Sequence, residues 1–226
     1  MKLSYPLIII NYKTYLETLG KKGLQIAKIA EKISLEYGVC IVVAPQFVDI
    51  RKISEEVSIP VFAQHVDSYP PGAYTGHITP ESIKEAGACG TLINHSEKRL
   101  RIDIIEEIVS RCNNLNLKTC ICANNTLIAK ALSLLKPEMI AVEPPELIGS
   151  GISVSKAKPE IIINSVNSIK SISPSVHVLC GAGITEGIDV KKAIEFGSEG
   201  VLVASAIAKS KDPEKILKEF AIALTK

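Results

Sequence analysis

Eight short apolar runs recur along the chain of 226 residues. Within each run the apolar residues are continuous and do not alternate with polar ones, which is typical of parallel strands buried on both faces. We therefore expect one parallel sheet with helices in the intervening segments. The predicted strands are Leu7–Ile10, Val39–Ala44, Val61–Ala63, Thr91–Ile93, Cys120–Ala123, Met139–Val142, Val176–Cys180 and Val201–Ala204.

The segments between the runs carry signals for helices. Thr79-Pro80-Glu81 and Asp212-Pro213-Glu214 each combine an N-cap residue, a proline at the first helical position and an acid in the first turn. Gly38, Gly87 and Gly197 lie where a helix should end before the next strand. Apolar stripes with helical spacing are formed by Ile26, Ile29, Ala30, Ile33 and Tyr37, by Ile102, Ile105, Val109 and Cys112, and by Leu217, Phe220, Ala221 and Leu224.

Eight such βα units favour a compact (β/α)8 barrel, an α/β fold of eight parallel strands ringed by helices. Right-handed crossovers close eight units into a barrel, whose common size is about 250 residues. An open doubly wound sheet is the alternative, and hydrophobic periodicity alone does not separate the two. The even distribution of the eight units and the lack of a linker favour a single barrel domain spanning residues 1–226.

Charge and aromatic content argue against a nucleic-acid partner. Lys and Arg number 26 against 24 Asp and Glu, and aromatic residues make up 4% with no Trp, which leaves few surfaces for base stacking. The apolar runs are far shorter than the roughly 20 residues that span a bilayer. The first residues lack the apolar core of a signal peptide. We expect a soluble cytoplasmic protein without a membrane partner.

Cysteines and histidines give no sign of a metal site. The six cysteines contain no C-x-x-C motif, and the one close pair, Cys120 and Cys122, would face the same side of a strand. We interpret them as buried free thiols, with metal binding or disulfides as the alternative. No two histidines have metal-ligand spacing, and we interpret His65, His77 and His177 as structural.

In a barrel of this kind, the chemistry lies at the C-terminal ends of the strands. The residues directly after the runs include a lysine, a histidine, a glutamate and small-residue turns. Together these groups could bind an anion and move a proton. They are Asn11 and Lys13, Gln64 and His65, Asn94, His95, Ser96 and Glu97, Glu143, Gly181, Ala182 and Gly183, and Ala204 and Ser205.

Glu143 ends the sixth run, so its carboxylate should stand at the mouth of the barrel. A glutamate is a weak base in water, with a pKa of about 4.3, and an apolar cover would raise its basicity. The segment 144–151 suits that purpose, because two prolines stiffen one end, Leu147 and Ile148 offer an apolar face, and two glycines, Gly149 and Gly151, loosen the other end. A solvated glutamate in an ordinary loop is the alternative.

His95 and Lys13 have electrostatic roles open to them. We expect His95 near the N-terminus of the next helix, which would keep the imidazole neutral and able to donate to a substrate oxygen. Asn11 and Lys13 share one side of the extended chain, and Lys13 would present a positive charge to an anion or a developing oxyanion. A loop histidine and a surface lysine are the alternatives.

The turns after the last two strands predict a phosphate site. Backbone N–H groups at Gly181-Ala182-Gly183 and at Ala204-Ser205 could contact a phosphate closely. A dinucleotide fingerprint is not predicted, because the spacing of Gly181, Gly183 and Gly187 is wrong and no acidic partner is placed for a ribose.

Taken in order, these motifs resemble the triosephosphate isomerase family and, within it, the shorter archaeal type. Asn11-Tyr12-Lys13 resembles the family's N-x-K, 94–99 its H-S-E-R/K stretch, and 141–151 its catalytic glutamate and mobile loop. Residues 180–184 and 200–205 resemble its two phosphate-binding turns. The lid reads Pro-Glu-Leu-Ile and the last turn Ala-Ser, which departs from the bacterial and eukaryotic pattern but is similar to the archaeal branch.

The resemblance implies a TIM barrel that interconverts dihydroxyacetone phosphate and D-glyceraldehyde 3-phosphate, in glycolysis and gluconeogenesis, with no metal or organic cofactor. Triosephosphate isomerase is itself the standard example of tuned acid–base groups. Its roles map onto Glu143 as base, His95 as neutral electrophile and Lys13 as stabiliser of the enediolate. The remaining implied residues are Asn11, Ile148, Gly183, Ala204 and Ser205 for substrate binding, and Glu97, Gly149 and Gly181 as supporting residues.

The resemblance also implies a homo-oligomer, a tetramer or a dimer, with loops such as Ser68–His77 in the subunit contact. Two other functions stay open on the residues alone. A barrel acting on a larger sugar phosphate would need only the glycine turns. A non-catalytic phosphate-binding module would have no need for Lys13, His95 and Glu143 together.

Overall fold

The computed structural model describes residues 3–144, 153 and 159–225. Its strands are all parallel and lie in one eight-stranded sheet in the order β2-β1-β8-β7-β6-β5-β4-β3. Each predicted run forms a strand, and its ends shift by at most two residues. The strands are β1 (Leu7–Asn11), β2 (Cys40–Ala44), β3 (Phe62–Ala63), β4 (Gly90–Ile93), β5 (Lys118–Ala123), β6 (Met139–Val142), β7 (His177–Cys180) and β8 (Gly200–Val203).

The two ends of this sheet meet where β2 approaches β3. Val43 forms a parallel bridge with Val61, and its N–H donates to the Pro60 carbonyl at 3.1 Å. The amide of Gln64 crosses the same seam to the Ala44 carbonyl at 3.0 Å. The sheet thereby closes into a (β/α)8 TIM barrel, as predicted, and the open doubly wound alternative is wrong.

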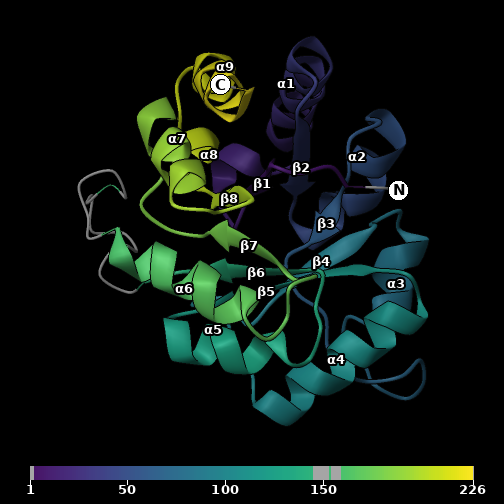
Figure 1. Ribbon diagram of the computed structural model, residues 1–226. Helices are drawn as coiled ribbons and strands as arrows, with labels where there is room; N and C mark the ends of the chain where they lie inside the picture. Colours follow the sequence, from purple (N-terminus) through teal and green to yellow (C-terminus); the bar gives the residue numbers. More distant parts are fainter. Residues whose placement is uncertain (1–2, 145–152, 154–158, 226) are drawn as a thin grey trace.

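Helices surround the strands on the outside of the barrel (Figure 1). The predicted caps are confirmed: Thr79 accepts a hydrogen bond from the Ser82 N–H at 3.1 Å, with Pro80 at the helix start, and Gly38 follows its helix with a left-handed φ of 66°. The helices are α1 (Lys21–Tyr37), α2 (Ile50–Glu56), α3 (Pro80–Glu85), α4 (Ile102–Asn114), α5 (Thr126–Ser133), α6 (Glu160–Lys170), α7 (Gly187–Glu195), α8 (Ser205–Ala208), α9 (Pro213–Thr225) and the 3-10 turns η1 (Leu16–Thr18) and η2 (Phe47–Asp49).

Each strand divides its side chains between two apolar layers. In β1, Leu7 and Ile9 belong to the core inside the barrel, whereas Ile8 and Ile10 pack in the layer between strands and helices. All four side chains are fully buried. Burying such a side chain contributes about 1.5–3 kcal/mol relative to exposure. Burial on both faces explains why the sequence runs are continuous.

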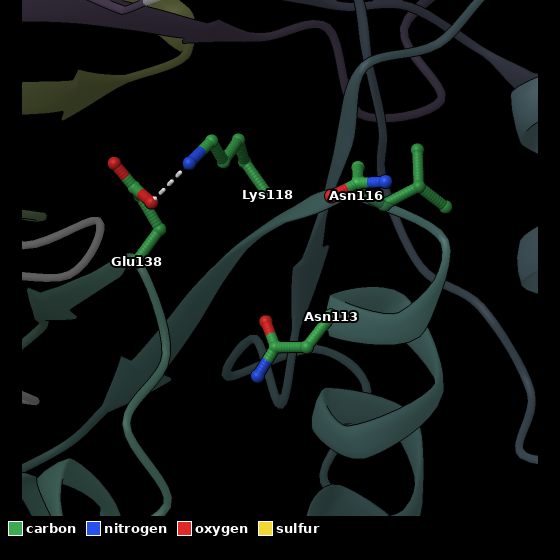
Figure 2. Close-up of a pocket in the computed structure, with 5 residues that line it drawn as sticks. Asn113, Asn116, Lys118 and Glu138 are labelled. Atoms are coloured by element: carbon green, nitrogen blue, oxygen red, sulfur yellow. Dashed lines mark hydrogen bonds and ion pairs between the residues drawn. The ribbon is translucent and has the colours of Figure 1, made fainter.

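The N-terminal ends of the strands are covered by the start of the chain. Leu3 is buried there, and the Tyr5 ring stacks on His177 with centroids 3.5 Å apart. A cavity of about 320 Å³ lies nearby, where the Nζ atom of Lys118 and Oε2 of Glu138 are 2.6 Å apart (Figure 2). The predicted site residues that the structure describes lie instead at or after the C-terminal ends of the strands.

The cysteines are free thiols, and Cys120 and Cys122 face the barrel interior together, as predicted. Cys40 and Cys89 are only half-buried, contrary to the expectation of burial, because they lie at the N-terminal ends of β2 and β4. Within the described ranges, no group of three or more His, Cys, Asp or Glu side chains could hold a metal ion. None of the helices described has the length and apolar character needed to cross a membrane.

Candidate active site

A chain of contacts joins the polar side chains that follow β1, β4 and β6. The Nζ atom of Lys13 lies 2.7 Å from Oε1 of Glu97. The backbone N–H of Glu97 donates to Nδ1 of His95 at 3.2 Å. The Nε2 atom of His95 lies 3.2 Å from Oε1 of Glu143. Four of the predicted site residues therefore form one cluster at the C-terminal end of the barrel.

The contacts of His95 define its tautomer. Because Nδ1 accepts the Glu97 N–H, a neutral ring carries its proton on Nε2, and this proton faces Glu143. The carboxylate of Glu97 is 3.6 Å from Nδ1, beyond hydrogen-bond range. The predicted position of His95 at a helix N-terminus is wrong, because α4 begins only at Ile102 and a turn separates the two. The contact of Nδ1 is instead with the single backbone N–H of Glu97.

Glu143 is buried, with 2% of its surface exposed, so the solvated alternative is excluded. Its N–H donates to the Ala123 carbonyl at 2.7 Å, and its carboxylate accepts a longer hydrogen bond of 3.4 Å from the Ser96 N–H. A Cβ atom at Gly181 would come within 2.7 Å of Glu143 Cγ. Gly181 therefore leaves the room that the glutamate side chain occupies.

The thiol of Cys122 contacts the same carboxylate from β5. Burial raises the pKa of Cys122 well above its usual range, and the charge of Glu143 raises it further. The thiol therefore stays protonated and donates to Glu143. The alternation of β5 predicts that Cys122 faces the barrel interior, but it does not reveal the partner.

Lys13 is held in a strained backbone conformation, with φ at 48°. The Asn11 side chain accepts the Lys13 N–H at 2.9 Å, and the Gln64 amide donates to the Lys13 carbonyl at 2.8 Å. Only 18% of the Lys13 side chain is exposed, which excludes the surface-lysine alternative. The sequence places Gln64 after a strand but does not reveal this role, since its partners are the backbone carbonyls of Lys13 and Ala44, which are distant in the chain.

The predicted phosphate turns follow β7 and β8 at this same end of the barrel. Gly183 has a left-handed φ of 72°, and α8 starts at Ser205, directly after Ala204. Ile148 and Gly149 lie outside the described residues, as does the predicted lid from residue 145 onward. The described part of the candidate site therefore comprises the cluster of Lys13, His95, Glu97 and Glu143 and the two predicted turns.

Comparison with known proteins identifies the family. A triosephosphate isomerase family model matches residues 6–220. The triosephosphate isomerase of Methanocaldococcus jannaschii is 56% identical over 94% of this chain and 97% of its own length. Those of Methanothermus fervidus and Sulfurisphaera tokodaii are both 51% identical, over 95% and 96% of this chain and 96% and 94% of their own lengths. These relatives confirm the resemblance to the archaeal type. The chain belongs to the triosephosphate isomerase family and is an isomerase.

Proposed function

We propose that the chain interconverts dihydroxyacetone phosphate and D-glyceraldehyde 3-phosphate through an enediolate, as a step of glycolysis and gluconeogenesis. The observation that carries this proposal is the 3.2 Å approach of His95 Nε2 to the Glu143 carboxylate. Moving a carbonyl along a carbon chain requires a base beside a C–H bond and a proton donor beside the neighbouring oxygen. A carboxylate and an Nε2–H that converge meet that requirement.

The reaction needs three protein groups and no net addition of atoms. Glu143 takes a proton from C1 of dihydroxyacetone phosphate, the C–H electron pair forms the C1–C2 double bond, and the carbonyl pair moves onto the C2 oxygen. His95 protonates that oxygen and takes the proton from the C1 oxygen, and Glu143 then returns its proton to C2. The Lys13 ammonium stabilises the negative charge that develops on oxygen.

Asn11 places the substrate, and backbone groups near Gly183, Ala204 and Ser205 hold its phosphate together with Ile148. Gly149 and Gly181 support this arrangement, as does Glu97. The predicted lid excludes water, which matters because an exposed enediolate phosphate can eliminate phosphate before isomerisation is complete. The resemblance implies no cofactor, so the substrate's own carbonyl is the electron acceptor.

We also propose a cytoplasmic single-domain protein, residues 1–226, that forms a homotetramer, with a dimer as the alternative. Exposed apolar patches mark association sites, and large apolar side chains are exposed at α5 and in the loop 68–77. Leu127 and Leu134 are 74% and 63% exposed. Tyr69 and Tyr74, in the loop 68–77, are 40% and 42% exposed.

An assay with D-glyceraldehyde 3-phosphate, coupled to reduction of the ketone product, tests the function. Wild-type protein should turn over, whereas Glu143→Gln should fold normally and lose about 10²–10⁴-fold in kcat. Glu106→Gln, on the exposed face of α4, is the matched control and should keep full activity. Exchange of the substrate's carbon-bound hydrogen with solvent should follow the same pattern. Full activity of Glu143→Gln would remove Glu143 as the base, and absence of exchange in the wild type would contradict isomerisation.

A further inference from the structure

Asn94, the residue directly before His95, adopts a backbone conformation that most residues avoid. Its φ is 58°, in the left-handed region, which asparagine tolerates better than other residues with a side chain. The β4–β5 ladder ends just before it, with Ile93 opposite Ile121. The chain therefore leaves the sheet at Asn94, and this turn sets the direction in which His95 leaves the strand.

The side chain of Asn94 is buried, and both of its polar ends are paired. Its Nδ2 donates to the Cys122 carbonyl at 2.9 Å, and its Oδ1 accepts the Leu100 N–H at 2.9 Å. Arg99 donates to the Asn94 carbonyl at 3.0 Å. The first contact requires a donor and the second an acceptor, so an aspartate could satisfy only one of them. The amide thus fixes both ends of the loop that carries His95.

Strand β5 holds the proposed base in the same way. The Ala123 carbonyl accepts the Glu143 N–H at 2.7 Å, one residue beyond the carbonyl that accepts Asn94. Two successive carbonyls of β5, those of Cys122 and Ala123, therefore anchor both the loop that carries His95 and Glu143. We propose that Asn94 is a positioning residue, which sets His95 against Glu143 through this shared anchor on β5.

This proposal rests on the proposed roles of His95 and Glu143. A displacement of about 1 Å in an acid–base pair can cost roughly 100-fold in rate. Loss of the Asn94 amide should therefore lower kcat more than it raises KM, because no hydrogen bond among the described residues joins this loop to the predicted phosphate turns after β7 and β8. A residue that served only stability would change the thermal midpoint and leave kcat of the folded enzyme unaltered.

The experiment compares three variants by steady-state kinetics and thermal unfolding. Asn94→Gly keeps the left-handed turn but removes the amide. Asn94→Asp keeps the acceptor for Leu100 and loses the donor. The matched control is Asn116→Gly, because Asn116 has an almost identical φ of 57° but is exposed beside the cavity of Figure 2.

We expect kcat to fall by about 10- to 100-fold in both Asn94 variants, with KM changed only a few-fold, and to stay unchanged in Asn116→Gly. Wild-type kcat in folded Asn94→Gly or Asn94→Asp would overturn the proposal. So would an equal loss of kcat in the control. Should Asn94→Gly fail to fold, the nearly isosteric Asn94→Asp decides the question.

A double-mutant cycle separates this inference from the proposed function. In a His95→Gln background, Asn94→Gly should cause no further loss, because the residue that it positions is gone. A full additional loss would show that Asn94 acts by another route and would overturn the proposal. Full activity of His95→Gln alone would instead contradict the proposed role of His95. The His95 variant thus tests the proposed function, and the Asn94 variants test the positioning role.

Discussion

Lys13 and Glu97 form an ion pair of 2.7 Å in which 18% of the lysine side chain and 60% of the glutamate side chain are exposed. The glutamate therefore approaches the shielded ammonium from the solvent side. An ion pair this exposed contributes about 0–1 kcal/mol to stability. Its greater effect is to hold the ammonium in one place. Because the backbone N–H of Glu97 also contacts His95, the same residue relates the positions of the ammonium and the imidazole.

Replacing Lys13 by alanine should cost activity and not stability. Removing one charge aimed at a developing oxyanion lowers kcat by about 10²–10³-fold. Steady-state kinetics and a thermal unfolding curve measure the two effects separately. Lys84→Ala on the exposed face of α3 is the matched control and should behave as wild type. An unaltered rate in Lys13→Ala would rule out the electrostatic role.

Gly181→Ala should disturb the base without changing any polar group. The added Cβ would lie 2.7 Å from Glu143 Cγ and 3.1 Å from the Val142 carbonyl, so the carboxylate has to move. We expect a loss of about 100-fold in kcat. Gly38→Ala is the contrasting variant, because Gly38 has open space around it but a left-handed φ of 66°. It should cost about 1–2 kcal/mol of stability and no activity. Equal kcat values for the two variants would contradict this account of Gly181.

Stability should depend on pH through His65. Burial lowers the pKa of His65 below its ordinary 6.5, and nearby Lys98 lowers it further, although the contact with Asp67 opposes both. The folded protein binds this proton less readily than the unfolded chain. The stabilising contribution is therefore complete above about pH 6.5 and is lost as the pH falls through the lowered pKa.

His65→Gln removes this titration and should flatten the decline in unfolding free energy below pH 6.5. Urea unfolding at a series of pH values measures the slope. His77 contacts the other oxygen of Asp67 at 3.3 Å, so the comparison needs a His77→Gln variant as well. Identical slopes for wild type and His65→Gln would show that another group causes the decline.

The oligomer should depend on the apolar surface of α5. Leu127 on α5 and Leu134 at its C-cap are seven residues apart, about two helical turns, and both are largely exposed. Replacing both with glutamate should lower the mass measured by sedimentation, because burying two carboxylates in a subunit contact is unfavourable. Ile188 on α7, which is 49% exposed, supplies the control position. An unchanged mass in the double variant would exclude this face from the contact.

The barrel and the cluster of polar residues at its C-terminal end could be predicted because both follow local rules. Continuous apolar runs identify strands buried on two faces, and the residues after them are brought to one end by parallel topology. Lys13, His95 and Glu143 are found in this way. The contacts around these residues cannot be predicted in the same way, since Gln64, Cys122 and Asn94 form them with groups that are distant in the chain.

His95 illustrates how a residue can be placed correctly in the cluster while the reason given for its surroundings is wrong. Sequence proximity suggested a helix N-terminus, but a turn and several further residues separate His95 from α4. Whether one N–H points at a ring nitrogen depends on a few backbone dihedral angles. Those angles follow from the packing of the whole loop, to which Asn94 contributes and which no periodicity encodes.

The seam between β2 and β3 has a consequence for the motions of the barrel. Strands β5 and β6 pair over four residues, whereas β2 and β3 are joined by the single bridge of Val43 with Val61. Local opening takes the least free energy where the fewest hydrogen bonds have to break. Amide protons at this seam should therefore exchange with deuterium earlier than those of β5 or β6. Since Gln64 donates both across the seam and to the Lys13 carbonyl, each such opening would free the backbone of Lys13 while the remaining strands stay folded.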